Sequence, residues 1–465
     1  MKPVFGLIII FILFVCYAEE RTYSISMLGH KIGTSTEKWE KVQHKDGKCF
    51  IKLDTKSSME VSRGRDSVKL YSKSTTIVKC KTFKPVSIKT ETKETATGVK
   101  GSGHVKDNTF FAEIIKNRKK ESFSYPLSND LTFFSMIFKK YPPEKLLKGG
   151  KINVISEESL HSVPISFSGK KVGPSHFEID INFSGVPIKF HIVDKAIVRS
   201  ELQNGLIVYE LIEDSDSGTS QKKEKRTADI IELTSKSNSG ITVKHPRKTR
   251  KVVFSFSGKN LPEIPSNCYQ SVTRKNSNEV VTVNMGASPC GIGDVSGSDL
   301  KPNIFEDSDS PSIIKVANKL GSGVKGRDAL INKVISFVFK HIRDKNYSHG
   351  NLSASETLKK RAGDCTEHST LLSAILKALK IPTRMVYGIV LDQEGNFFFH
   401  NWNEVYTKKG WISVDSTFGM KRADAARIVL AYGGSDASSR EQVALTVLRF
   451  LGSDFKIYVN GFFYE

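Results

Sequence analysis

The period of the hydrophobic residues changes once along this chain, and this change restricts the fold more than any other feature. From about residue 20 to residue 290, apolar and polar residues alternate in short runs such as Phe177-Glu178-Ile179-Asp180-Ile181-Asn182-Phe183, separated by glycine, serine and proline clusters. This pattern predicts an antiparallel sheet with one buried face. Farther on, apolar residues recur at helical spacing and form one helix face from Ala329, Ile331, Val334, Ile335, Val338, Phe339 and Ile342. We therefore expect a β-rich region followed by an α+β domain.

The segment between the two patterns has the composition of a linker. Residues 291–312 are rich in glycine, serine, aspartate and proline and include Asp307-Ser308-Asp309-Ser310-Pro311. At 465 residues the chain is also too long for one ordinary hydrophobic core. The sequence predicts a β-rich N-terminal region over 19–290, a linker over 291–312 and a second domain over 313–465.

A short motif recurs within the β-rich region. Ile25 to Gly33 matches Ile165 to Gly173 at the same spacing, and Phe254 to Lys259 repeats its first half. Each copy is interpreted as a hairpin whose glycine takes the positive φ of a tight turn. Two explanations stay open: the region contains two related β-lobes, or similar hairpins simply look alike. A helix over 130–147 is expected to connect the copies.

The N-terminus has the pattern of an export signal. Lys2 precedes an apolar run from Val4 to Val15, and the small residue Ala18 follows. The run is shorter than the roughly 20 residues that a membrane-spanning helix needs. We expect residues 1–18 to be a signal peptide, with an uncleaved anchor as the alternative. The mature protein, without a transmembrane span, is then exported: periplasmic, envelope-associated or secreted.

Beyond the signal there are five cysteines: Cys49, Cys80, Cys268, Cys290 and Cys365. An odd number outside the cytosol suggests that one thiol is kept apart from disulfides, and Cys365 has the setting of a reactive thiol. Among the other four, sequence proximity favours Cys49–Cys80 and Cys268–Cys290, with buried thiols as the alternative.

The formal net charge of the chain is +21 at pH 7. Dense basic runs occur at 222–226 and 245–251. A field of this sign favours anionic partners, so we expect an anionic envelope polymer as a partner besides the substrate. Solvated basic loops are the simpler explanation for each run. No nucleic-acid-binding module accompanies the charge, and we therefore expect no nucleic acid partner.

Cys365 stands at the expected start of an amphipathic helix. Gly363-Asp364 precedes it, leucine and isoleucine residues follow at helical spacing, and Pro382 closes the segment. At a helix N-terminus, the unpaired N–H groups and the helix dipole favour an anion, which lowers the pKa of a thiol and enriches the thiolate. The backbone N–H of Cys365 is also placed to donate to a developing oxyanion.

His400 and Asp415 complete a candidate nucleophilic site. His400 lies in a strand-like run, and a histidine facing the helix start can take the thiol proton and then protonate a leaving amine. Asp415 ends the next strand-like run, after the turn Lys408-Lys409-Gly410, and its carboxylate would orient the other ring nitrogen. The two residues meet only if the register of the two strands allows it.

With these residues the chain resembles the transglutaminase-like superfamily, in the form found in exported bacterial proteins. The resemblance rests on Cys365 with its leucine-rich helix, Ile381-Pro382-Thr383-Arg384, the pair His400-x-Trp402 and the segment from Trp411 to Thr417, and spans roughly 325–420. It implies a papain-like α+β fold and a catalytic triad: Cys365 the nucleophile, His400 the general base and acid, Asp415 the orienting carboxylate. Asn401 and Ser416 depart from the commonest family pattern without removing a reacting group. The β-rich half resembles regions that precede such domains in exported bacterial proteins.

Other residues near the triad have a functional and a structural explanation. Tyr347 is a candidate substrate or oxyanion contact, with a packed surface tyrosine as the alternative, and Trp402 either walls the site or fills the core. Cys365 and His368 form a Cys-x-x-His pair, but without a second such pair we expect no metal and no cofactor.

The predicted function is therefore thiol-dependent acyl transfer on protein or peptide substrates. The triad alone does not select the acceptor, and the resemblance to bacterial members of the superfamily implies peptide or amide hydrolysis. A protein-glutamine transglutaminase or deamidase is the first alternative. A non-catalytic, envelope-binding module on the same fold is the second.

Overall fold

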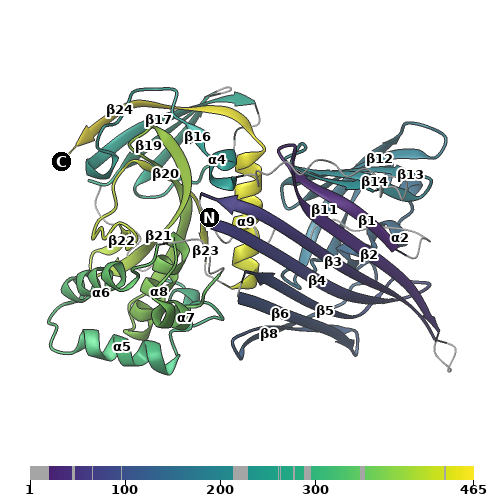
Figure 1. Cartoon of the computed structure of the whole chain (residues 1–465), viewed down its shortest axis with the longest axis horizontal. Helices are drawn as coiled ribbons and strands as arrows, with labels where there is room; N and C mark the ends of the chain where they lie inside the picture. The colour runs from purple at the N-terminus through teal and green to yellow at the C-terminus, as the bar shows by residue number, and fades with distance from the viewer. Residues whose placement is uncertain are drawn as a thin grey trace. The chain divides into compact units, whose positions relative to one another are not determined.

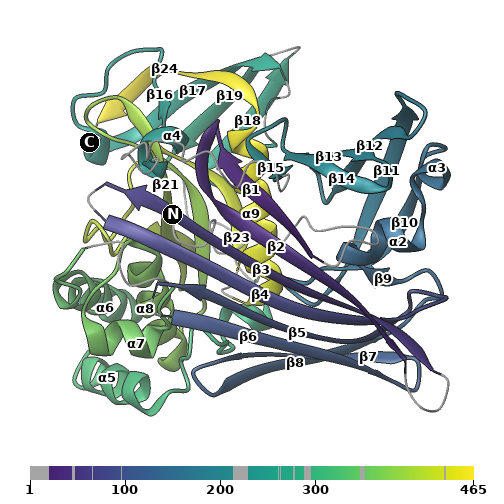
Figure 2. The same cartoon turned by 45° about the vertical axis from the view of Figure 1, so that its right-hand side comes forward.

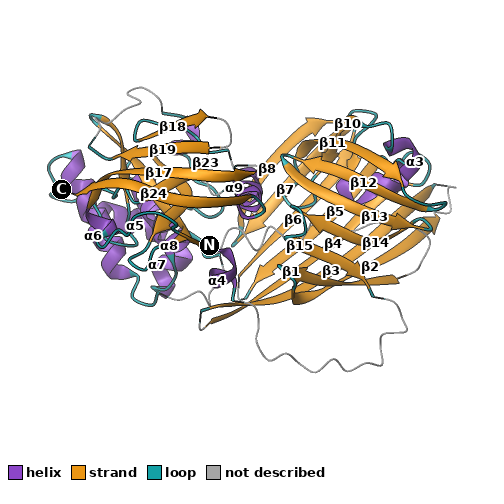
Figure 3. Cartoon of the chain, turned by 90° about the horizontal axis from the view of Figure 1, so that it is seen from above, coloured by secondary structure: helices purple, strands orange, loops and turns teal. Residues whose placement is uncertain are grey.

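The chain has an α+β fold with a β-rich N-terminal region, as the sequence predicts. A computed structural model describes residues 20–43, 48–64, 66–95, 97–212, 229–259, 261, 263–275, 278–286, 295–345, 351–433 and 436–464, with 52% strand and 20% helix. Two compact units divide between Ile230 and Ile231. Figure 3 distinguishes the strands of both units from the helices. The predicted signal peptide, residues 1–18, lies outside the described residues.

The N-terminal unit is built on a 15-stranded sheet of order β8-β7-β6-β5-β4-β3-β2-β1-β15-β14-β13-β12-β11-β10-β9. Two antiparallel meanders, β1 to β8 and β10 to β15, join where β1 pairs with β15, and Figures 1 and 2 show the strands of the first meander side by side. The strands are β1 (Glu20–Met27), β2 (His30–Gln43), β3 (Cys49–Arg63), β4 (Asp66–Lys79), β5 (Pro85–Glu94), β6 (Thr97–Lys106), β7 (Thr109–Lys116), β8 (Lys119–Pro126), β9 (Thr132–Phe133), β10 (Gly150–Ile155), β11 (Ser162–Lys171), β12 (His176–Phe183), β13 (Val186–Val193), β14 (Ala196–Leu202) and β15 (Ile207–Leu211).

Period-two alternation determines which face of these strands is buried. In β12 the four apolar residues are buried and the polar residues between them are more exposed. The expected helix over 130–147 is broken into η1 (Phe134–Met136), α2 (Ile137–Lys140) and α3 (Pro143–Leu146), with Pro142 and Pro143 at the break. A disulfide joins Cys49, at the start of β3, to Cys80, just after β4.

Only the first copy of the recurring motif forms the predicted turn. Leu28 and Gly29 have positive φ and connect β1 to β2. The prediction is wrong for Gly169, which pairs with Ile179 inside β11, and for Gly258, which pairs with Phe455 inside a strand. At both positions a Cβ would lie under 3.0 Å from a neighbouring backbone oxygen, so glycine there allows close strand approach and does not form a turn.

The C-terminal unit contains two sheets and a group of helices. One sheet has the order β16-β21-β20-β23, with β22 paired to β21, and the other has the order β18-β19-β17-β24. Helices α5, α6 and α7 contact α8, which contacts β20 and β21 (Figure 1). The elements are α4 (Ile230–Thr234), β16 (Lys236–Ser237), η3 (Pro246–Lys248), β17 (Thr249–Lys259), β18 (Gln270–Lys275), β19 (Asn278–Asn284), η4 (Gly297–Asp299), α5 (Pro311–Gly321), α6 (Arg327–His341), α7 (Ala354–Lys360), α8 (Cys365–Ala378), β20 (Thr383–Leu391), β21 (Asn396–Thr407), β22 (Gly410–Val414), β23 (Arg427–Gly433), α9 (Ala437–Leu451) and β24 (Asp454–Tyr464).

The division between the units differs from the boundary that composition suggests. Residues 231–290 were expected in the N-terminal region, but β17 pairs antiparallel with β24 at the other end of the C-terminal unit. Part of the expected linker is also packed into this unit. Glu306 is fully buried and lies 3.1 Å from Lys377 of α8, and Asp307 accepts a hydrogen bond from the N–H of Ser355. Alternation alone does not reveal which distant strand becomes the partner.

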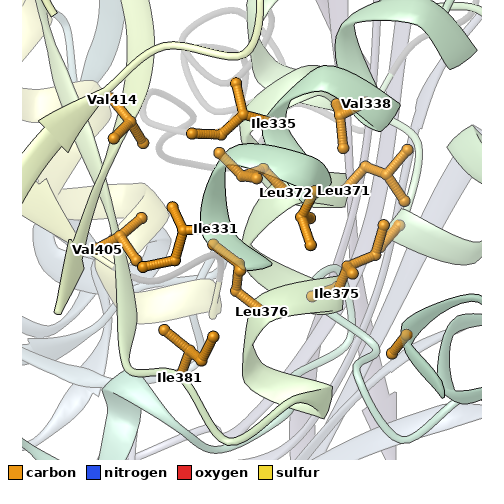
Figure 4. Packing of buried hydrophobic residues seen from close by; sticks show 14 of the residues in the cluster. Ile331, Ile335, Val338, Leu371, Leu372, Ile375, Leu376, Ile381, Val405 and Val414 are labelled. Carbon is orange, nitrogen blue, oxygen red and sulfur yellow. The ribbon is translucent and has the colours of Figure 1, made fainter. Parts of the chain in front are cut away.

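The hydrophobic core of the C-terminal unit lies around α8. Figure 4 shows Leu371, Leu372, Ile375 and Leu376 of α8 among side chains of α6 and of β21 and β22. Most of the predicted face of α6 is confirmed by its buried residues Ile331, Val334, Ile335 and Val338. The prediction is wrong for Ala329, which is exposed, and for Phe339, which is 39% exposed. This packing holds the first turn of α8 against β21, where the candidate site lies. Among the described residues, no helix combines the length and the apolar character needed to cross a membrane.

Candidate active site

Helix α8 begins at Cys365 because the residues around it form a capping box. Asp364 Oδ1 accepts a hydrogen bond from the N–H of Thr366 at 2.9 Å, and Glu367 Oε2 accepts one from the N–H of Asp364 at 3.0 Å. Both acids therefore interact with the unpaired N–H groups and the dipole at the N-terminus of α8. The caps fix the direction in which the first turn leaves the preceding loop.

Gly363 allows the loop to approach the helix closely. Its φ is +145°, and a Cβ atom at this position would lie 2.4 Å from Glu367 Cβ. Glu367 is fully buried, and its Oε1 also accepts a hydrogen bond from the N–H of Leu352. A side chain at residue 363 would therefore displace the carboxylate that caps α8.

His400 lies within β21, and Asp415 follows the end of the neighbouring strand β22. Strands β21 and β22 pair antiparallel, with Asn403 opposite Val414, so that Asp415 leaves β22 beside His400. The His400 Nε2 and Asp415 Oδ2 atoms are 2.8 Å apart, and both residues are buried. The other carboxylate oxygen, Oδ1, accepts hydrogen bonds from the N–H groups of Thr417 and Phe418. The carboxylate is thus held in place from both sides.

Cys365, the first residue of α8, interacts with His400, and this interaction acts on the pKa of both groups. It is buried and not disulfide-bonded. Burial raises the pKa of the Cys365 thiol, whereas the hydrogen bond and charge of His400 lower it. Burial lowers the pKa of His400, but the charge and hydrogen bond of Asp415, together with Cys365, raise it to about 9. The positive charge of His400 therefore favours the thiolate form of Cys365.

Two aromatic rings lie parallel to the His400 ring. The Trp402 centroid is 6.2 Å from that of His400, with 19° between the planes, and the Phe418 centroid is 5.0 Å away, with 22° between the planes. Trp402 is 1% exposed and packs with Val386, Val390 and Val429, so its burial supports the core explanation over direct contact with a substrate. Phe418 is 43% exposed and forms the accessible edge of the site.

Sequence reasoning missed Phe418 and the cation behind Asp415. Arg427 is 2% exposed, and its Nη1 donates to Asp415 Oδ2 at 3.0 Å. Burial raises the pKa of Asp415, but His400 and Arg427 together hold it well below its usual range. An arginine at the start of an apolar strand carries no local signal of this role, because arginines are usually at the surface.

The remaining predicted residues differ in their placement. Asn401, which departs from the family pattern, is buried and donates to Thr366 Oγ1 at 3.0 Å. His368 Nδ1 lies 2.7 Å from the carbonyl oxygen of Asp364, and burial lowers the pKa of this histidine to about 4. His368 is thus a neutral, buried residue of α8. Tyr347 lies outside the described residues.

The cysteine pattern is partly visible in the structure. The predicted pairing of Cys49 with Cys80 is confirmed. Cys268 is also disulfide-bonded, and Cys290 lies outside the described residues.

One family model and several solved structures are similar to parts of the chain. Residues 314–416 match the family model of the Transglutaminase-like superfamily. No curated protein is significantly similar to the chain. Among solved structures, a candidate cysteine protease from Cytophaga hutchinsonii is 17% identical, over 47% of this chain and 86% of its own, with a TM-score of 0.28. A β-barrel-like protein of unknown function from Brucella abortus is 9% identical, over 42% of this chain and 95% of its own, with a TM-score of 0.31.

A candidate protease from Parabacteroides distasonis is 10% identical, over 86% of this chain and 71% of its own, with a TM-score of 0.21. The matched range of the family model contains Cys365, His400 and Asp415 and follows the β-rich region. The chain therefore carries a domain of the transglutaminase-like superfamily, C-terminal to a β-rich region.

Proposed function

We propose that this chain is an exported thiol acyl-transfer enzyme that hydrolyses peptide or amide bonds. The observation that carries the proposal is that Cys365 at the start of α8 interacts with His400, and His400 in turn is hydrogen-bonded to Asp415 at 2.8 Å. Each side chain has the chemistry that its position requires: a nucleophile, a proton carrier and an orienting anion. The aromatic rings of Trp402 and Phe418 further restrict the orientation of His400.

In the proposed mechanism, Cys365 Sγ attacks the carbonyl carbon of a carboxamide or peptide bond. The partial positive charge at the N-terminus of α8 stabilises the oxyanion that forms. The C–N bond then breaks, the amine leaves with the proton of His400, and a thioester remains on Cys365. His400 next takes a proton from water, and the hydroxide adds to the thioester carbonyl. The C–S bond then breaks, which releases the acid and restores the thiolate of Cys365 beside the protonated His400.

The acceptor of the acyl group separates the proposed hydrolase from the first alternative. Water as the acceptor gives a protease, amidase or deamidase, whereas a lysine amine gives a protein-glutamine transglutaminase. Incubation with glutamine-containing peptides and a labelled primary amine, followed by mass spectrometry, distinguishes these outcomes. We expect chain cleavage or amide hydrolysis. Amine incorporation that exceeds hydrolysis would favour the crosslinker.

Alkylation of Cys365 by iodoacetamide tests whether the site is reactive at all. We expect fast labelling at neutral pH and a decrease of about 100-fold or more in His400→Ala, because the imidazolium no longer stabilises the thiolate. His341→Ala is a matched control, since His341 belongs to the same unit and binds the carbonyl oxygen of Leu358. Slow labelling that does not depend on His400 would favour the non-catalytic binding module.

Export and an anionic partner belong to the same proposal. The Cys49–Cys80 disulfide supports an oxidising compartment. Lys56 and Lys73 lie directly opposite each other on β3 and β4, and both are exposed. Like charges in this position repel, and an anionic polymer would relieve the part of this repulsion that Glu91, opposite Lys73 on β5, leaves in place.

Polyphosphate binding, measured by titration at increasing salt, tests this surface. We expect Lys56→Gln/Lys73→Gln to weaken binding and salt to abolish it. The control Lys38→Gln changes an exposed lysine that already lies 3.2 Å from Glu40. Binding that is insensitive to both salt and the double substitution would exclude this surface as the polymer site.

A further inference from the structure

The basic run at 245–251 contains one arginine that reaches toward the candidate active site. Arg247 lies in η3, and 27% of its side chain is exposed. Its Nη1 donates to Asp424 Oδ2 at 2.7 Å, and its Nη2 donates to the carbonyl oxygen of Leu391. The guanidinium also lies over the Phe418 ring, 5.1 Å from its centroid. Arg247 thus differs from a solvated surface cation.

Asp424 connects Arg247 to the base of the site. Its Oδ2 accepts a second hydrogen bond from Arg427 Nη2 at 2.6 Å, and Arg427 Nη1 donates to Asp415 Oδ2 at 3.0 Å. Asp424, Arg427 and Asp415 are all at most 2% exposed. With His400 and Cys365, the side chains form a row of alternating charge: Arg247, Asp424, Arg427, Asp415, His400 and Cys365.

We propose that Arg247 is a positioning residue for the acyl transfer, acting on His400 through Asp424, Arg427 and Asp415. The inference rests on the proposed function, because it assigns a role in the protonation of His400. The same oxygen of Asp415 binds both His400 and Arg427. A stronger interaction of Asp415 with Arg427 therefore weakens its interaction with the protonated His400 ring. Asp424 also binds Arg427 and thereby weakens the interaction of Arg427 with Asp415. Arg247 neutralises the charge of Asp424 and so reduces this effect.

A second contact leads from Arg247 to His400 by a different route. Phe418 lies between the two side chains, with its ring stacked on His400 at 5.0 Å and the Arg247 guanidinium over it. Cation–π attraction therefore helps to hold Phe418 against the imidazole. Loss of Arg247 affects both the charge and the orientation of His400.

Other charged or titratable groups near Cys365 and His400 come from separate elements and stay unchanged in the proposed variants. Lys345, after α6, is held by the carbonyl oxygen of Thr417 at 3.0 Å. On α8 and its cap, Asp364 acts on Cys365, and His368 stays neutral.

Titration of His400 by NMR tests the proposal in a Cys365→Ala chain with ¹³C-labelled histidine. The signal is assigned by its loss in His400→Gln. We expect the His400 midpoint to rise by about 1 unit in Arg427→Gln and by about 0.5 unit in Arg247→Gln, because each substitution strengthens the hold of Asp415 on the imidazolium. Arg247→Lys keeps the charge and should reverse most of the shift.

Arg384→Gln is the matched control. Arg384 has the same side-chain exposure, 27%, and is also paired with a buried acid, Glu404. We expect no shift of His400 in this variant. An unchanged midpoint in Arg247→Gln, or a shift equal to that of the control, would overturn the inference. Circular dichroism of each variant verifies that it is folded.

The outcomes separate this inference from the proposed function. His400-dependent alkylation of Cys365 together with an unchanged titration in Arg247→Gln overturns the inference alone. Slow alkylation that ignores His400 overturns the proposed function, whatever the titration shows.

Discussion

Asp415 and His400 are joined by a 2.8 Å hydrogen bond between Oδ2 and Nε2, and both residues are buried. The bond holds the imidazole in one orientation and places a negative charge beside it in a site with little access to water. Such a charge stabilises the protonated ring more strongly than it would at the surface. The first two predictions depend on this bond.

The alkaline limit of activity should follow His400. Its pKa is raised from 6.5 to about 9, so the stabilisation from the charged ring is complete below about 6.5 and is lost as pH rises through about 9. We expect kcat/KM for amide cleavage to fall with an apparent pKa near 9, since the ring then no longer protonates the leaving amine. A pH–rate profile that keeps rising through this range would contradict the assignment.

Replacement of the carboxylate should impair the site without unfolding it. We expect Asp415→Asn to reduce the rate of amide cleavage by roughly 10²- to 10⁴-fold, because an amide neither stabilises the imidazolium nor fixes the tautomer. The comparison is Asp392→Asn, which changes an aspartate that accepts a hydrogen bond from the N–H of Asn396. Equal rates in the two variants would remove Asp415 from the proposed mechanism.

Gly363 should tolerate no side chain. In Gly363→Ala the new Cβ would meet the buried Glu367 side chain, so we expect a loss of about 1–3 kcal/mol in the free energy of unfolding and slower alkylation of Cys365. Gly395 also has a positive φ, +89° against +145° at Gly363, but no atom lies within 4 Å of the Cβ that Gly395→Ala would add. Denaturant titration of both variants separates the clash from the backbone strain. Similar losses in both would mean that the clash is relieved by a small movement.

The Cys49–Cys80 disulfide should stabilise the N-terminal unit. The bridge closes a segment with a sequence separation of 31, and the chain-entropy relation gives about 3–4 kcal/mol for such a loop. We expect Cys49→Ser/Cys80→Ser to lower the free energy of unfolding by about this amount in a denaturant titration. If reduction of the wild-type chain leaves the transition unchanged, the bridge does not contribute in this way.

The core around α8 should depend on Ile375. We expect Ile375→Ala to cost about 2–5 kcal/mol, because the residue is fully buried and the cavity would be lined by neighbours from other helices. Ile314→Ala removes the same atoms from a side chain that is 42% exposed, and should change stability by about 1 kcal/mol or less. Denaturant titration gives the loss of unfolding free energy in each variant, and the difference between the two losses measures the contribution of packing around α8.

Local sequence determined the individual elements of this protein. Alternation in residues 177–183 is sufficient for β12, since a strand with one buried face needs apolar residues at every second position. The start of α8 is likewise local, because Asp364 and Glu367 cap the helix from within three residues of Cys365. The residues that the structure brings together at the site, Cys365, His400 and Asp415, were therefore identifiable from their own segments.

Only the tertiary structure decided which distant segments became neighbours. The pairing of β17 with β24 joins residues about 200 positions apart. The alternation of apolar and polar residues in each strand is equally compatible with many other partner strands. Arg427 and Arg247 show the same limit, because a lone arginine has no pattern until the fold places a buried carboxylate beside it. Periodicity and capping act over a few residues, whereas strand partners and buried ion pairs depend on which surfaces exclude water together, and that is a property of the folded chain as a whole.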